Sequence, residues 1–283
     1  MRLFGLRTMF FGAQRILAWS GGVEDRPTTE IPCEIYALPV AISAQDPGGD
    51  IRASHYWTRY GFVYAGSALP ASMTAVTAST FLQNLVRQGD RDNPPPFEAL
   101  AGLVFRLAQR FMQESRRYGM DGKFSAAFFG WSPYESDYKV AHIDGRDDGG
   151  FRVELSMPDQ PIGNGEPWLV LGNGAGTFRS TLATYKASKD GAESRVPLRI
   201  VEKMVAGDTD PTVGGSASVA AAHEHGFEMF YSVRSGAAGQ QASHRLFNGL
   251  DLDDEVGTVD QYFVAARGIG ISHDYLLQGK VRA

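Results

Sequence analysis

The sequence predicts an α+β fold, a four-layer αββα sandwich in which two antiparallel sheets pack together and helix pairs cover their outer faces. Segments with the period of a strand and segments with the period of a helix arrive in separate blocks. The strand segments come in pairs joined by short turns, which favours antiparallel hairpins. The blocks follow the order strand pairs, two helices, strand pairs, two helices and a final strand pair.

The first block holds four strand candidates. Leu3–Phe11 and Arg15–Ser20 flank a short turn at 12–14, which predicts a hairpin close to Met1. Cys33–Ile42 is the third candidate and Tyr60–Ala65 the fourth, with an Asp-Pro-Gly-Gly-Asp turn cluster between them.

Two helices are predicted next. From Pro70 to Arg87 apolar residues recur at helical spacing, and Gly89 supplies a stop. These residues are Met73, Val76, Thr77, Phe81 and Leu85. Three consecutive prolines at 94–96 then open a second helix, which Gly119 closes. Its predicted apolar face consists of Phe97, Leu100, Val104, Leu107 and Phe111.

The second half repeats this alternation. Strands are predicted at Phe124–Trp131, Tyr138–Ile143, Phe151–Met157 and Trp168–Leu171, helices around Phe178–Tyr185 and at Pro197–Val205, and a last hairpin from Ser216–Ala222 and Phe227–Val233. We therefore expect one domain over residues 1–233. Residues 234–283 show a looser pattern, with a strand-like segment at 261–265, and are predicted to be a C-terminal extension packed on the domain or projecting from it.

Composition excludes several classes of function. The formal charge of −5 comes from 27 basic and 32 acidic residues that are scattered along the chain, so we expect no nucleic-acid partner. The apolar runs are much shorter than the roughly 20 residues that cross a bilayer, so we expect no membrane span. A single cysteine, Cys33, forms no internal disulfide, and the cytoplasm is the expected location. No cofactor is expected.

Three segments together carry a resemblance to a known family. Tyr64-Ala65-Gly66-Ser67-Ala68 feeds the first helix, a glycine-rich turn at 172–176 precedes the third, and an Asp-to-Gly-Gly passage at 208–215 follows the fourth. In this order and spacing they resemble the proteasome β-subunit group of the N-terminal-nucleophile (Ntn) hydrolases, which includes HslV and Anbu. The resemblance covers roughly residues 1–233.

The resemblance implies a specific catalytic apparatus, most of which the sequence lacks. Members use an N-terminal Thr, Ser or Cys as nucleophile, and its own α-amine accepts the proton. The corresponding position holds Met1 or Arg2, and the first lysine is Lys123, so the third-strand lysine of the family is missing. Glu24 or Asp25 matches the family's aspartate. The turn formed by Gly66, Ser67 and Ala68 matches the segment whose backbone N–H stabilises the oxyanion.

These expectations lead to a proteasome-like subunit that is catalytically inactive and serves as a structural component of an oligomeric assembly, since the family assembles into rings. The alternative is an active Ntn peptidase or amidohydrolase with an unrecognised nucleophile, for which Cys33, Thr28 and Ser20 are the weak candidates. A third hypothesis is a ligand- or partner-binding module, in which the former catalytic cleft or the extension at 234–283 does the recognising.

Three further segments have both a functional and a structural interpretation. The turn at 172–176 could cradle a phosphate, but no Walker lysine follows, which favours a packing turn. The His223-Glu224-His225 segment could bind a metal, but no further ligands at typical spacing accompany it, so none is expected. The His55-Tyr56-Trp57 segment is a candidate interface anchor, although ordinary partial burial explains it equally well.

Overall fold

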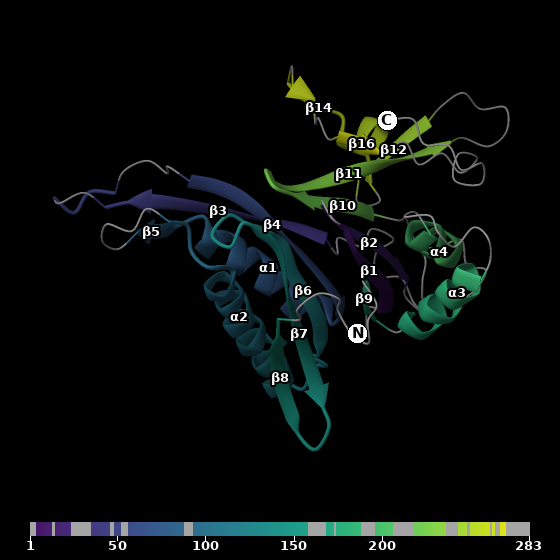
Figure 1. Ribbon diagram of the computed structural model, residues 1–283, viewed down its shortest axis with the longest axis horizontal. Helices are drawn as coiled ribbons and strands as arrows, with labels where there is room; N and C mark the ends of the chain where they lie inside the picture. Colours follow the sequence, from purple (N-terminus) through teal and green to yellow (C-terminus); the bar gives the residue numbers. More distant parts are fainter. Residues whose placement is uncertain are drawn as a thin grey trace.

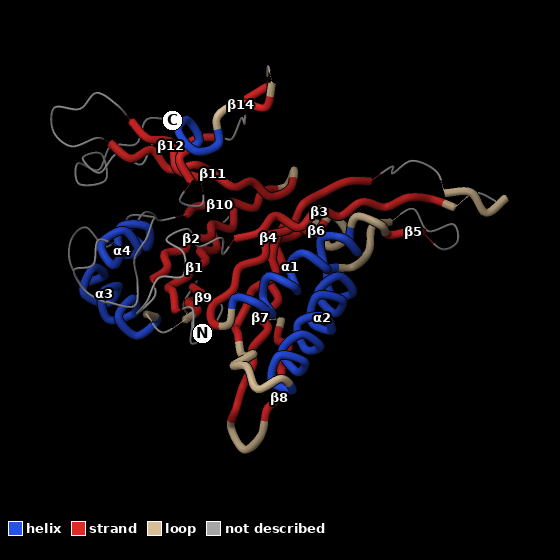
Figure 2. Tube along the Cα trace, turned by 180° about the vertical axis from the view of Figure 1, so that it is seen from behind, coloured by secondary structure: helices blue, strands red, loops and turns tan. Residues whose placement is uncertain are grey.

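The computed structural model is a mixed α/β structure with two main sheets. It describes residues 4–12, 15–23, 35–45, 48–51, 56–87, 93–157, 168–172, 174–187, 196–205, 218–235, 243–247, 250–260, 262–263 and 267–269. Figures 1 and 2 show the two sheets from opposite sides, with one helix pair beside each sheet.

The first sheet has six strands in the order β5-β3-β4-β6-β7-β8. In that order the strands span Leu85–Arg87, Ile35–Ala44, Tyr56–Gly66, Phe124–Ser132, Asp137–Asp147 and Phe151–Ser156. Neighbouring strands are antiparallel except β5, which runs parallel to β3. Strand β4 lies inside the sheet, where Val63 pairs with Ile35 on one side and with Ala127 on the other.

From Tyr60 to Ala65, β4 is buried on both faces, and its alternate side chains point to opposite sides of the sheet. Tyr60, Phe62 and Tyr64 belong to one hydrophobic cluster, whereas Val63 and Ala65 belong to another. A strand covered on both faces is expected to read as a nearly continuous apolar run. The segment at 60–65 has this composition, which explains why the sequence predicted it as a strand.

Helices α1 (Ala68–Leu82) and α2 (Phe97–Arg117) cover the first of these faces. Helix α2 follows the prolines at 94–96, and the backbone N–H of Phe97 donates a hydrogen bond to Glu135 Oε1 at 3.1 Å. This carboxylate satisfies one of the free N–H groups at the helix start and opposes the positive end of the helix dipole. Gly119, with φ +75°, follows the last turn.

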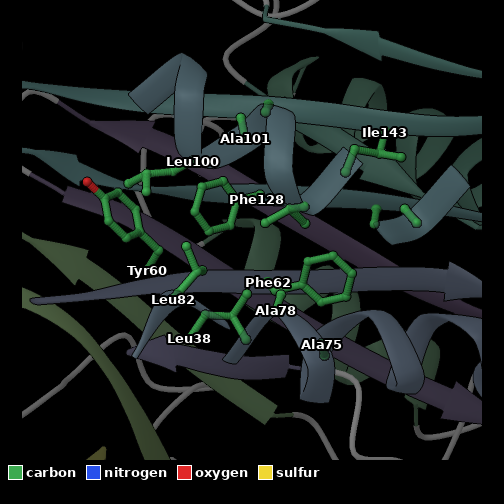
Figure 3. Packing of buried hydrophobic residues seen from close by; sticks show 14 of the residues in the cluster. Leu38, Tyr60, Phe62, Ala75, Ala78, Leu82, Leu100, Ala101, Phe128 and Ile143 are labelled. Carbon is green, nitrogen blue, oxygen red and sulfur yellow. The ribbon is translucent and has the colours of Figure 1, made fainter. Parts of the chain in front are cut away.

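The core under these helices is built on aromatic rings (Figure 3). The Phe128 ring lies 5.1 Å from the Tyr60 ring and 5.3 Å from the Phe97 ring. Helix α1 contributes small residues instead, among them Ala71, Ala75 and Ala78, which are fully buried. Large rings on the sheet therefore fit against small residues on the helix, which lets the two approach closely.

The second sheet has eight strands, seven of them in the order β13-β12-β11-β10-β2-β1-β9, with β16 pairing parallel to β11. In the same order the strands span Leu250–Asp251, Ser243–Phe247, Gly226–Ser235, Ser218–His223, Arg15–Val23, Phe4–Gly12 and Trp168–Leu171, and β16 spans Arg267–Ile269. The predicted hairpin near the start of the chain is confirmed, since Phe4 pairs with Val23 and Gly12 with Arg15.

The two sheets meet through a second hydrophobic cluster. It joins residues of the first sheet such as Val63 and Phe129 to residues of the second such as Ala220 and Phe227. The Phe129 and Phe227 rings pack edge to face with centroids 5.5 Å apart. Gly61 lies beneath both rings, and a Cβ atom there would be 2.5 Å from each of them. The contact between the sheets therefore requires glycine at this position.

Helices α3 (Ala175–Ala187) and α4 (Val196–Val205) contact the second sheet. Helix α4 lies against β2, and α3 lies against β1 and β9. Their buried residues include Phe178, Leu182, Ile200 and Met204. Figure 1 shows this pair on the side of the second sheet, away from α1 and α2.

The edge strand β8 and its neighbour β7 carry a ladder of exposed ion pairs. Arg146 contacts Asp144 at 2.9 Å and Glu154 at 3.1 Å, and Arg152 contacts Glu154 at 3.0 Å and Asp148 at 3.1 Å. Exposed ion pairs add little stability individually. Their position on an edge strand nevertheless places alternating charge along an open row of backbone groups.

The prediction for the first helix needs correction. The helix predicted from Pro70 to Arg87 ends at Leu82, because Leu85–Arg87 form strand β5 beside β3. The apolar residues that carried its spacing lie on the outer side of the helix, where Met73, Val76 and Phe81 are exposed. Within residues 234–283, β12, β13 and β16 join the second sheet, and β11 spans Gly226–Ser235.

Within the described part of the chain, no helix has both the length and the apolar character needed to span a membrane.

The close approach of the two sheets at Gly61 can be tested by substitution. Gly61→Ala would force Phe129 and Phe227 apart, and overpacking of this kind typically costs about 1–3 kcal/mol of unfolding free energy. Gly102→Ala is the matched control, because its nearest neighbour is the flexible end of Arg106 at 3.5 Å and alanine favours a helix by up to about 1 kcal/mol. Urea denaturation is expected to show a loss for the first variant and none for the second.

Candidate functional site

The turn between β4 and α1 is a tight junction built on Gly66. This residue has φ +113°, and a Cβ atom there would be 2.7 Å from the carbonyl oxygen of Lys123 and 2.9 Å from Cα of Phe124. Only glycine fits both the backbone angle and this close approach. The turn is therefore held against the first residues of β6, where Gly66 pairs with Phe124.

The backbone N–H of Ser67 donates a hydrogen bond to the carbonyl oxygen of Lys123 at 2.9 Å. Ser67 is the N-cap residue of α1, but its side chain makes no capping hydrogen bond. An oxyanion hole needs backbone N–H groups that are free to face the reacting oxygen. One N–H of the turn predicted to have this role is instead committed to a contact with β6.

Lys123 lies at this turn, although no local pattern in the sequence indicates this position. Its carbonyl accepts the Ser67 N–H, and its own N–H donates to Asp121 Oδ1 at 3.4 Å. The lysine that the resemblance implies belongs to the third strand, whereas Lys123 immediately precedes β6. The sequence could not identify this neighbour, because the register of β4 against β6 brings the two segments together.

A polar pair lies next to the turn, on β6 and β7. Ser125, which pairs with Ala65 of β4, has its hydroxyl 2.8 Å from Nε2 of His142 on β7. Burial is the main cause that lowers the pKa of His142, and Arg146 lowers it further, while Asp144 opposes both effects. A neutral imidazole at this distance is suited to accept the serine proton.

Ser125 and His142 do not form a catalytic triad with Asp144. A triad needs a carboxylate that orients the imidazole through its second nitrogen. Asp144 lies two residues from His142 on the same strand, but its carboxylate accepts from Arg146 Nε at 2.9 Å. The arrangement is therefore a hydrogen-bonded Ser–His pair across two strands. Its spacing of 17 residues carried no signal in the sequence.

The structure describes only one of the weak catalytic candidates, Ser20. Cys33, Thr28 and Asp25, together with Glu24, lie outside the described residues. Ser20 lies in β2, where its backbone is paired with Arg7 of β1 and Ser218 of β10. Of the predicted site residues, the structure describes the Gly66–Ala68 turn most fully and places it beside Ser125.

The segments at 223–225 and 172–176 lie at junctions between elements. His223 and His225 flank the β10–β11 turn, with ring centroids 5.9 Å apart, and the N–H of His225 donates to Nδ1 of His223 at 3.2 Å. Among the described residues, no group of three or more His, Cys, Asp or Glu side chains is placed to hold a metal. In the segment at 172–176, the N–H of Ala175, the first residue of α3, donates to the carbonyl of Gly172 at 3.2 Å.

The candidate interface segment is described only in part. His55 lies outside the described residues. Tyr56 packs against the core on one side of β4, whereas Trp57 is 55% exposed on the other side. The guanidinium of Arg59 lies over the Trp57 ring at 4.4 Å, a cation–π contact.

Comparison with known proteins adds one finding. No family model matches the sequence, and no curated protein matches it. Among solved structures, Anbu (ancestral beta-subunit) from Yersinia bercovieri is similar, with a TM-score of 0.51 over 77% of this chain and 81% of that chain. The fold is proteasome-like. The 11% sequence identity limits this similarity to the fold, so the catalytic state of the chain is not part of the finding.

Substitution of Gly66 tests the close approach that fixes the turn of this proteasome-like fold. Gly66→Ala must displace the backbone at Lys123 and Phe124 in addition to straining φ. Gly119→Ala is the control, because Gly119 also has positive φ but has no atom within 4 Å of the added Cβ, so only the strain of about 1–2 kcal/mol remains. We expect a larger loss of unfolding free energy for Gly66→Ala. Equal losses would contradict the clamped geometry.

The pH dependence of stability tests the burial of His142. Because its folded pKa lies below the unfolded value of about 6.5, the unfolded chain binds the proton first as the pH falls. The contribution of His142 is fully present above about pH 6.5 and is lost below it. His142→Gln should make the unfolding free energy less dependent on pH between 7.5 and 5. Ser125→Ala should leave this dependence in place, because burial is the main cause.

Proposed function

We propose that the chain is a proteasome-like subunit without peptidase activity that serves as a structural component of an oligomeric assembly. The observation that carries this proposal is the hydrogen bond from the Ser67 N–H to the Lys123 carbonyl at 2.9 Å. This bond ties the turn after β4 to the residue before β6, so the Ser67 N–H holds two neighbouring strands together. Such a turn supports the fold rather than the stabilisation of a reaction intermediate.

The sequence supports the same conclusion independently. No lysine precedes Lys123, so the third strand carries none, and an arginine does not replace a lysine in proton transfer because it stays protonated. The lysine that the resemblance implies is therefore missing from the third strand.

The proposal includes the four-layer αββα architecture. Helices α1 and α2 contact the six-stranded sheet, the two sheets share the cluster around Phe129 and Phe227, and α3 and α4 contact the second sheet. These contacts support the order helix pair, sheet, sheet, helix pair. Residues 234–283 then extend the second sheet beyond the domain at 1–233, and the pairing of β12 with β11 supports a role for them in assembly or partner binding.

The proposed setting is the cytoplasm, supported by the single cysteine of the sequence. The proposed partner is a further copy of the same chain, and the resemblance implies that the copies form rings or other homo-oligomers.

Activity assays on the full chain test the proposal. We expect no turnover of fluorogenic peptides and no labelling by a threonine-directed covalent inhibitor, because the third strand lacks the lysine and the Ser67 N–H is bonded to the Lys123 carbonyl. Light scattering and particle images are expected to show particles larger than the 30.8 kDa monomer.

The alternative of an unrecognised nucleophile makes a different set of predictions. If Cys33, Thr28 or Ser20 acted as an N-terminal nucleophile, the intact mass would show that the chain begins at that residue. Labelling of such a processed chain, abolished by substitution of its first residue, would replace the structural proposal with the enzymatic one. Turnover without labelling in a full-length chain would direct attention to Ser125, which Ser125→Ala would test directly.

A further inference from the structure

The hydrogen-bonded pair of Ser125 and His142 faces the second sheet. On β6, Ala127 belongs to the hydrophobic cluster between the sheets, whereas Phe124 and Ala126 belong to the cluster under α1 and α2. Alternate side chains of a strand share a face, so Ser125 points to the same side as Ala127. Its hydrogen bond to His142 places the imidazole on that side as well.

The pair lies where the contact between the sheets gives way to solvent. Ala127 is the cross-strand neighbour of His142 and is fully buried. Ala65 is the cross-strand neighbour of Ser125 on β4 and is also buried. Ser125 and His142 themselves are partly exposed, and further along β7 the Arg146 side chain is 46% exposed. A small molecule can therefore reach the hydroxyl without separating the sheets.

The hydroxyl proton of Ser125 is directed to the imidazole. Its oxygen lies 2.8 Å from Nε2 of His142 and 3.5 Å from the carbonyl oxygen of Ile143. The second distance is beyond the usual range of a hydrogen bond, so this carbonyl competes weakly for the proton. When the hydroxyl donates, Nε2 is the acceptor and the ring proton is on Nδ1. In this tautomer the imidazole is able to act as a base.

The surroundings of His142 favour its neutral form. Burial lowers the pKa of His142, Asp144 opposes this effect, and Arg146 adds to it. Glu154 faces the same group from β8, where it is paired with Asp144. Arg146 contacts Asp144 at 2.9 Å and Glu154 at 3.1 Å, so its charge partly offsets both carboxylates. A neutral imidazole is therefore available as a base at pH 7.

The same surroundings restrict the chemistry to reactive acyl groups. The Asp144 carboxylate is bonded to Arg146 and does not orient the ring. The backbone of Ser125 is paired on both sides, with β4 and β7, so its N–H belongs to the sheet and not to an oxyanion hole. An ester with a good leaving group needs less of this assistance than a peptide bond. The small apolar side chains of Ala65 and Ala127 suit a short, uncharged acyl chain.

We propose that Ser125 is a nucleophile activated by His142 and that it accepts the acyl group of short, uncharged carboxylic esters. The Ser125 oxygen bonds to the ester carbonyl carbon as its proton passes to Nε2 of His142, and the alcohol leaves with that proton when its C–O bond breaks. Water then bonds to the acyl carbon, passes one proton to Nε2 and releases the carboxylic acid, while that proton returns to the Ser125 oxygen. This activity goes beyond the proposed structural function and does not involve the first residue of the chain.

Covalent labelling tests the nucleophile. The full chain is treated with a fluorophosphonate, which phosphonylates serines that a base activates, and peptide mapping by mass spectrometry locates the adduct. We expect the adduct at Ser125 and its complete loss in Ser125→Ala. Ser156→Ala is the matched control, because Ser156 is exposed and lies opposite His142 on β8, and it should leave the labelling unchanged.

The rate of labelling tests the imidazole. A general base contributes about 10²–10⁴-fold, so His142→Gln should slow phosphonylation of Ser125 by at least about a hundredfold. Circular dichroism melting verifies that each variant is folded. The pH profile of the unmodified chain provides a second measurement. Its labelling rate should be level above pH 7 and fall below about pH 6.5, because protonated His142 accepts no proton. A rate that rises without a plateau would indicate attack by hydroxide-activated serine and contradict the role of His142.

Turnover tests the acyl transfer itself. With p-nitrophenyl acetate as the probe, we expect an acid quench to trap an acetyl group on Ser125. Release of p-nitrophenol should fall to the level of buffer in Ser125→Ala and stay unchanged in Ser156→Ala.

The outcomes distinguish a reactive pair from a purely structural contact. A folded chain without an adduct at Ser125, or one that is labelled equally fast after His142→Gln, would overturn the proposal. Labelling of Ser125 in a chain that cleaves no fluorogenic peptide would support it and leave the proposed structural function in place.

Discussion

The burial of β4 on both faces is the constraint on which the rest of the structure depends. One set of its side chains carries the aromatic core under α1 and α2, and the other set carries the contact between the sheets. Gly61 makes the second role possible, because any side chain there would occupy the space of Phe129 and Phe227. The same strand then ends at Gly66, where a positive φ turns the chain into α1. One strand thereby sets the distance between layers and the start of the candidate site.

Most elements of this fold could be predicted from period and turn chemistry, because each of them depends on local sequence. The hairpin at the start of the chain, the prolines before α2 and the meander of β6, β7 and β8 are examples. Helix α1 shows where such reasoning stops. Its outward stripe is more apolar in composition than its buried face, which relies on alanines, so periodicity emphasised the wrong side. Leu85 continued that spacing but pairs with β3, a contact that only the tertiary structure provides.

The candidate site was predictable only where the sequence resembles a known family. Gly66 and Ser67 were identified because the segment 64–68 resembles the turn before the first helix in the proteasome β-subunit group. Ser125 and His142 were missed, since their contact depends on the register of β6 against β7 and neither residue lies in a motif. The carbonyl of Lys123, which occupies the Ser67 N–H, belongs to the same class of long-range contact. The resemblance thus located the turn, whereas strand register determines which groups its backbone contacts.

The charged ladder on β7 and β8 has a consequence for the edge of the six-stranded sheet. The salt links of Arg146 and Arg152 run beside the free backbone groups of β8, so a foreign strand that approached this margin would have to strip water from several ions at once. The ion pairs therefore disfavour the pairing of a foreign strand with this edge of the sheet.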